Sequence, residues 1–330
     1  MGLQDMINQF LDTTATLAAI NQPGKPLVVI NASDTTAAEV FSFTPDTLDD
    51  LCLSFNDIPV AAAVSASAAV PVAFSPVLLK NRAWSGCEGN RRPAGDWRTP
   101  LRADGGAYAN IEAFRTARYW ASLRADRLAY REEPYVRLLD GGRADNLRLT
   151  AARRVLMDPH SPAYVYSALG EGRLRRLVVI SVNARSDARN DIDQSAARTT
   201  IAEMVSAVTS VPIDATTANV AASFRGFIEN LMNGRERSRR AGKTVDFKIY
   251  PVEIDFDELP TNSPAEVADR DNVKSISTSW TITPEDVTLI DKVAGVLLWR
   301  HPCLNGLLDD LRASGEREAV APTTVQCPQQ

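Results

Sequence analysis

Short apolar runs that alternate with helical patterns are the feature that most constrains how this chain can fold. The runs at 27–34, 135–139 and 174–185 are typical of buried strands, and the stretches between them favour helices. This alternation predicts an α/β fold with a mostly parallel central sheet layered between helices. Because 330 residues can bury a sizeable core, we expect one large domain over 1–314 and a mobile tail over 315–330.

The remaining elements follow from hydrophobic period and turn residues. In chain order, the pattern predicts an amphipathic helix within the first 20 residues, a turn at 21–26, a strand at 37–44, helices at 45–55 and 58–69, a strand at 72–79, a long loop at 81–106, a helix at 107–131, helical segments within 191–232, a strand or strand pair at 244–256, and a helical end at 284–311. The first helix carries Asp5 and Asp12 and lacks a basic start, so a signal peptide is not expected there.

Composition and charge narrow the class of protein. Hydrophobic residues make up 45% of the chain and charged residues 23%, values typical of a globular protein. The formal net charge is −5, and the arginines are scattered rather than clustered. The charge therefore gives no electrostatic reason to expect nucleic acid as a partner.

Residues 58–79 form an uncharged run long enough to span a bilayer. Three prolines, at 59, 71 and 76, argue against a span, and the many Ala and Ser residues make the run only weakly apolar. We therefore expect a buried helix followed by a buried strand, with a membrane span as the alternative.

Cysteines and histidines do not form a recognisable metal motif. The two histidines, His160 and His301, lie in a turn and near a helix break, where surface or capping roles are expected. A zinc site and a Ser-His-Asp triad are therefore not expected. In an exported protein one or two disulfides could join the four widely spaced cysteines, which are Cys52, Cys87, Cys303 and Cys327.

Asp140 stands at the end of a predicted strand and is followed by Gly141 and Gly142. Open α/β sheets collect catalytic groups at the carboxyl ends of their strands, and two glycines let a backbone approach a ligand closely. The competing interpretation is an ordinary Asp-Gly turn. A second copy, at residues 104–106, follows no apolar strand and is expected to be such a turn.

Two other polar clusters are candidates. Asn31, Ser33 and Asp34 could line a pocket at a strand end, although capping of the turn is favoured. Ser65 and Ser67 lie among small residues that favour close backbone packing. No glycine flanks either of these two serines, so a nucleophile elbow is not expected there.

The segments "LVVINASDTTAAEVFSFT", "SFNDIPVAAAVSASAAVPVAFSPVLLKN" and "YVRLLDGGRADNLRL" together resemble the bacterial branch of the patatin-like phospholipases. The resemblance covers about residues 20–150, and the helical part within about 190–314 is also similar. It implies a lipid acyl hydrolase with a Ser-Asp dyad, no cofactor and no metal, acting on lipid at a membrane surface. It further implies that Asp140 is the base, on a turn supported by Gly141, Gly142 and Asn146.

The chain departs from the family pattern because it contains no G-x-S-x-G and no glycine-rich oxyanion loop before residue 27. We therefore expect the C-terminal part of such an enzyme, without its nucleophilic serine and inactive alone, whose N-terminal half another chain could supply. One alternative is a non-catalytic relative that binds lipid or a partner. The other is an enzyme with an improvised serine at position 33, 65 or 67. Full-length relatives are often exported, but the chain itself leaves the location open.

Overall fold

The computed structural model divides the chain into two compact units. Unit 1 comprises Met1–Ala168 and Met204–Phe227, and unit 2 comprises Leu169–Glu203 and Ile228–Gln330. The structure describes residues 5, 7, 9, 15–22, 24–35, 39–71, 74–82, 134–157, 165, 174–185, 201–242, 247–276, 281–314 and 327.

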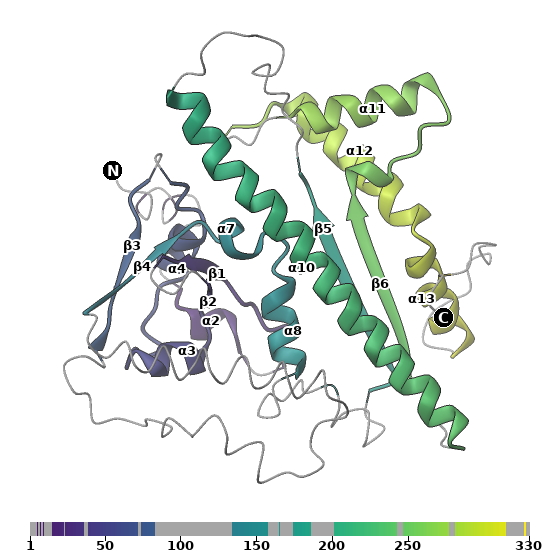
Figure 1. Ribbon diagram of the computed structural model, residues 1–330, viewed down its shortest axis with the longest axis horizontal. Coiled ribbons are helices and arrows are strands. Elements are labelled where there is room, and N and C mark those ends of the chain that lie inside the picture. The colour runs from purple at the N-terminus through teal and green to yellow at the C-terminus, as the bar shows by residue number, and fades with distance from the viewer. Residues whose placement is uncertain are drawn as a thin grey trace. The chain divides into compact units, whose positions relative to one another are not determined.

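Unit 1 contains a four-stranded antiparallel sheet in the order β2-β1-β4-β3 (Figure 1). Its strands are β1 (Asn31–Asp34), β2 (Glu39–Ser42), β3 (Val77–Lys80) and β4 (Tyr135–Leu139). All four were predicted as strands, but the mostly parallel arrangement is wrong for this sheet. Only residues 35–38 join β1 to β2, and a connection that short permits an antiparallel pair and no parallel crossover.

β1 is shorter than the sequence predicted. The apolar residues before it lie outside the strand, with Leu27 63% exposed and Val28 42% exposed. The side chain of Asn21 explains this, because its Oδ1 accepts from the backbone N–H of Val28 at 2.7 Å and its Nδ2 donates to the Val28 carbonyl at 3.2 Å. Those contacts use the backbone groups with which Val28 would pair in a sheet.

Short helices accompany the sheet. They are α2 (Leu17–Ile20), α3 (Pro45–Asp50), α4 (Val60–Ser67), α7 (Gly142–Asp145) and α8 (Leu149–Met157). Thr44 caps α3, since its side chain accepts from the Thr47 N–H. The predicted helices at 45–55 and 58–69 are confirmed in shorter form by α3 and α4.

The core of unit 1 lies between α4 and the sheet. Phe41 and Phe43 meet edge to face in it, with ring centroids 5.1 Å apart. The buried cluster consists of Leu17, Ala32, Phe41, Phe43, Leu48, Val60, Ala63, Ala66, Leu79 and Leu138. The alanines of α4 allow the close approach of helix and sheet that the small residues predicted.

Unit 2 is built on a parallel pair of strands, β5 (Arg176–Asn183) and β6 (Lys248–Asp255). The other elements are η4 (Phe256–Glu258), α11 (Pro264–Ser275), α12 (Pro284–Arg300) and α13 (Pro302–Ala313), and α10 (Ile201–Arg240) contributes residues to both units. The predicted strand at 244–256 is thus one strand, and the helical end is confirmed. A disulfide joins Cys303 to Cys327.

β5 and β6 differ in how they are covered. Val252 and Ile254 of β6 are buried in a cluster with residues of α12 and α13. Their register partners on β5, Ile180 and Val182, are 55% and 64% exposed. Partners in a parallel ladder point to the same face of the sheet, so the apolar layer over β6 stops short of β5.

Several predictions fall outside the described residues. These are the loop at 81–106, the helix at 107–131, the turn at 104–106, His160, and most of the first helix and of the tail at 315–330. Across the described part of the chain, no helix combines the length and apolar character that a membrane crossing requires.

Candidate functional site

Asp140 begins a tight turn directly after β4, as the sequence predicted. Its carboxylate is half-buried, and Oδ1 accepts a hydrogen bond from the Gly142 N–H at 2.8 Å. Its backbone N–H donates to the Ala69 carbonyl at 2.9 Å, and the Gly141 N–H donates to the Ser67 carbonyl at 3.1 Å. The end of α4 and the turn therefore hold each other in place.

Close contacts leave no room for a side chain at Gly141 and little room at Gly142. A side-chain carbon at Gly141 would lie 2.7 Å from the Asn31 carbonyl oxygen and 3.0 Å from the Arg148 guanidinium. At Gly142 it would lie 3.0 Å from Oδ1 of both Asp140 and Asn146. Gly141, Gly142 and Asn146 were predicted to support the turn, and they are packed closely in it. Asn146 itself is exposed.

Ser33 connects β1 to the turn through two hydrogen bonds. Its hydroxyl donates to the Asp140 carbonyl at 2.7 Å and accepts from the Ala144 N–H at 3.0 Å. Asp34, the next residue, is also buried, but successive strand residues point to opposite faces. The structure therefore brings Ser33 to the Asp140 turn and leaves Asp34 on the other face of β1.

Arg148 is the cation of the site. Its Nη1 donates to the Asn31 carbonyl at 2.7 Å, and its Nη2 donates to Ser67 Oγ at 2.9 Å. Its backbone lies in the left-handed region, with φ at 58°, which is uncommon for a residue other than glycine. Burial lowers the pKa of Arg148, and the nearby charges of Asp140 and Asp145 oppose that shift.

Asp145 is buried and binds the start of α8. Its side chain is 1% exposed, and Oδ2 accepts from the Thr150 N–H at 2.7 Å. Burial raises the pKa of Asp145, although hydrogen bonds from backbone groups at the start of α8 act in the opposite direction. A carboxylate is favourable at a helix N-terminus, so Asp145 fixes where α8 begins.

Two buried oxygens near this site lack a hydrogen bond in the described structure. They are Oδ1 of Asn31, which is 2% exposed, and Oδ1 of Asp145. A buried polar atom without a partner is unfavourable by about 1–3 kcal/mol. The site therefore contains unfavourable terms that the hydrogen bonds of Arg148 and Ser33 must offset.

None of the three improvised serines is placed as a nucleophile for Asp140. Ser65 is buried and donates to the Ala61 carbonyl at 2.6 Å within α4. Ser67 accepts from Arg148, and Ser33 is held by backbone groups of the turn. In the described residues no serine hydroxyl contacts the Asp140 carboxylate, and these three are occupied by structural bonds.

His301 is a capping residue, as predicted. Its Nδ1 lies 3.1 Å from the Cys303 N–H at the start of α13, and its Nε2 lies 3.2 Å from the Glu253 N–H. Burial lowers the pKa of His301, against the opposing charges of Glu253 and Glu258. A neutral imidazole accepts through only one nitrogen, so His301 accepts from one of these two N–H groups at a time.

Sequence reasoning missed Arg148 and Asp145. Both lie within the quoted segment around Asp140, but spacing assigned them no role, because their contacts with Asn31 and with the start of α8 arise only in the folded chain. The described residues contain no group of three or more His, Cys, Asp or Glu side chains that could hold a metal ion.

The arrangement offers one fixed, half-buried carboxylate next to a partly buried guanidinium. One oxygen of Asp140 is committed to the Gly142 N–H, and no hydrogen bond to the other is found within the described part of the chain. Such a carboxylate can accept a proton from a hydroxyl placed beside it. Comparison of the chain with protein-family models, with curated proteins and with solved structures gives no significant match.

Proposed function

We propose that unit 1 is the base-bearing part of a lipid acyl hydrolase of the patatin-like kind. Asp140 is its general base, and a polypeptide segment outside residues 1–330 supplies the serine nucleophile. The observation that carries the proposal is the position of Asp140: it follows a strand, its Oδ1 is fixed by the Gly142 N–H, and its turn has no room for a side chain at Gly141. The substrates are acyl esters of phospholipids or other lipids.

The chemistry requires Asp140 to accept a proton and pass it on twice, once in each half of the reaction. The carboxylate accepts the serine proton as the serine oxygen attacks the ester carbonyl, and the proton then passes to the alcohol that leaves. Water next attacks the acyl-serine with Asp140 as base, and the proton taken from water passes to the serine oxygen as the acid is released. Arg148 lies close enough to Asp140 for the two charges to interact.

A non-catalytic role in binding lipid or a partner is the second candidate. It is favoured by the engagement of Ser33, Ser65 and Ser67 in structural hydrogen bonds, which leaves Asp140 without a serine among them. In this case the Asp140 turn is a structural remnant of an active site, and its carboxylate transfers no proton.

A chimeric protein separates the two candidates. A segment carrying G-x-S-x-G from a patatin-like enzyme is fused before residue 27, and hydrolysis of p-nitrophenyl butyrate is measured beside fluorophosphonate labelling by intact mass. We expect the unfused chain to show neither activity nor label. The chimera should gain both, and Asp140→Asn should lower its hydrolysis by about 10²–10⁴-fold.

Asp140→Asn is the sharper variant because its amide oxygen can still accept from the Gly142 N–H. Arg143→Gln, in the same turn, is the matched control and should leave hydrolysis unchanged. A folded chimera that takes the label and hydrolyses ester equally well with Asp140→Asn would show that Asp140 is not the base. A label on the unfused chain that depends on Ser33, Ser65 or Ser67 would instead locate the nucleophile there.

A further inference from the structure

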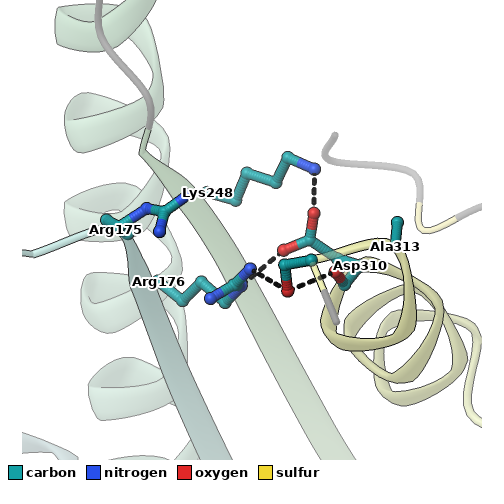
Figure 2. Close-up of a pocket in the computed structure, with 6 residues that line it drawn as sticks. Arg175, Arg176, Lys248, Asp310 and Ala313 are labelled. Carbon is teal, nitrogen blue, oxygen red and sulfur yellow. Dashed lines mark hydrogen bonds and ion pairs between the residues drawn. The ribbon is translucent and has the colours of Figure 1, made fainter. Parts of the chain in front are cut away.

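A cavity of about 200 Å³ lies in unit 2, far along the chain from Asp140. It opens between the first residues of β5 and β6 and the last turn of α13 (Figure 2). The residues that line it are Arg175, Arg176, Lys248, Asp310, Ala313 and Ser314. Its walls are therefore mostly charged.

Strand register brings the basic residues together. Arg176 pairs with Lys248 across the parallel ladder, so both side chains leave the same face at the same level. Arg176 Nε donates to Oδ2 of Asp310 at 2.5 Å, and Lys248 Nζ contacts Oδ1 of the same carboxylate. Arg176 Nη2 also donates to Ser314 Oγ at 3.0 Å. Figure 2 shows the two cations reaching α13 from the strands.

The lining carries more positive than negative charge. Burial alone would raise the pKa of Asp310, but hydrogen bonds from Lys248 and Arg176 outweigh it and leave that pKa below its ordinary value. Asp310 is thus ionised at neutral pH, and it is the one acid among three basic lining residues. The structure therefore gathers three basic side chains and one carboxylate around this small cavity.

We propose that this cavity binds a phosphate group. Arginine presents donors in a planar fork that matches phosphate oxygens, and lysine adds a compact charge with three donors. A volume of about 200 Å³ is below the ~300–1,000 Å³ typical of sites for whole drug-sized ligands. The site therefore holds the phosphate itself, and the remainder of the molecule extends into solvent. The group belongs either to a lipid headgroup or to a soluble phosphate ester.

Binding of inorganic phosphate to the full chain tests the proposal without any need for catalysis. Isothermal titration at low salt should show saturable binding. Arg175→Gln should weaken it by about tenfold, since a hydrogen bond to a charged group contributes roughly 1.5–3 kcal/mol. Asp310→Asn should strengthen it several-fold, because it removes the carboxylate that competes for Arg176 and Lys248.

The opposite signs of these two variants distinguish a binding site from a structural ion pair. Arg300→Gln replaces an exposed arginine that pairs with Glu266 and does not line the cavity, so it is the control for net charge and should not change binding. The proposal is overturned if wild type shows no saturation at millimolar phosphate, or if Arg175→Gln and Arg300→Gln bind equally well. Circular dichroism before titration establishes that each variant is folded.

Vesicles identify the source of the phosphate once that binding is established. Wild type is sedimented with phosphatidylcholine vesicles that contain or lack phosphatidic acid. Retention that needs phosphatidic acid and falls with Arg175→Gln assigns a lipid headgroup. Saturable phosphate binding without vesicle retention assigns a soluble phosphate ester. Either result leaves the assignment of Asp140 as a base to be decided by the chimera.

Discussion

Nη1 of Arg148 donates a hydrogen bond of 2.7 Å to the backbone carbonyl of Asn31, a residue 117 positions earlier in the chain. Through this bond the end of the turn that begins at Asp140 is tied to β1, and through Ser67 it is tied to α4. The same guanidinium fills the space beside Gly141. Arg148 therefore connects the Asp140 turn to both β1 and α4.

Replacement of Arg148 by Met is expected to lower the free energy of unfolding by about 1–3 kcal/mol, because it keeps the side-chain volume but removes the donor to the Asn31 carbonyl. Urea denaturation followed by circular dichroism measures the change. Arg143→Met is the matched control, since no side-chain hydrogen bond of Arg143 is found in the described structure. Equal losses in the two variants would mean that the Asn31 contact contributes little.

Gly141→Ala should destabilise the protein by about 1–3 kcal/mol, the usual range for overpacking. The added carbon would meet the Asn31 carbonyl oxygen at 2.7 Å, a backbone atom that cannot move aside alone. Gly295→Ala, inside α12 with no atom within 4 Å, should instead stabilise by up to about 1 kcal/mol. Thermal melts of both variants test this difference in sign, and a neutral Gly141→Ala would contradict the packing described.

Asp145 should make stability fall as pH rises. Its pKa in the folded state is raised above the ordinary 3.8, so the folded protein binds the proton more tightly than the unfolded chain. Its contribution is fully present below pH 3.8 and is lost as pH rises through the folded pKa. The stability of Asp145→Asn relative to wild type should thus increase as the pH rises from 3.5 to 7, a range of roughly three to four pH units. Urea midpoints at each pH give the difference, and a constant difference would refute the shift.

The disulfide between Cys303 and Cys327 should stabilise unit 2. It closes a loop with a sequence separation of 24, for which chain entropy predicts about 3 kcal/mol. Cys327→Ser is expected to lower the melting transition of unit 2, and dithiothreitol should lower it in wild type but not further in the variant. Because Cys52 is also disulfide-bonded, the comparison with the variant isolates the effect of this bond.

The sequence predicted which segments form strands and helices better than how the strands pair. The apolar run at β4 and its Asp-Gly-Gly turn were predicted correctly because both signals are local. Hydrophobic period carries no information on strand direction, so the antiparallel sheet was missed, although the short link at 35–38 favours it. The start of β1 was predicted too early because Asn21 holds Val28 through a contact that hydrophobic period does not indicate, whereas the end at Asp34 was predicted correctly.

The candidate site was predictable only in part. Asp140 follows β4 as predicted, because an acidic residue directly after an apolar run can be recognised from the sequence alone. The roles of Arg148 and Asp145 could not be predicted, because their contacts with Asn31 and Thr150 form only when the chain folds. Ser33 was noticed, but its bonds to the turn give it a structural part that spacing alone did not indicate.

The exposed apolar row of β5, Val178, Ile180 and Val182, also bears on how long the protein survives in a cell. Uncovered apolar surface next to an edge strand is what chaperones capture and what leads to aggregation when they are saturated. The steady-state amount of this chain should therefore depend on this exposed row as well as on the free energy of unfolding.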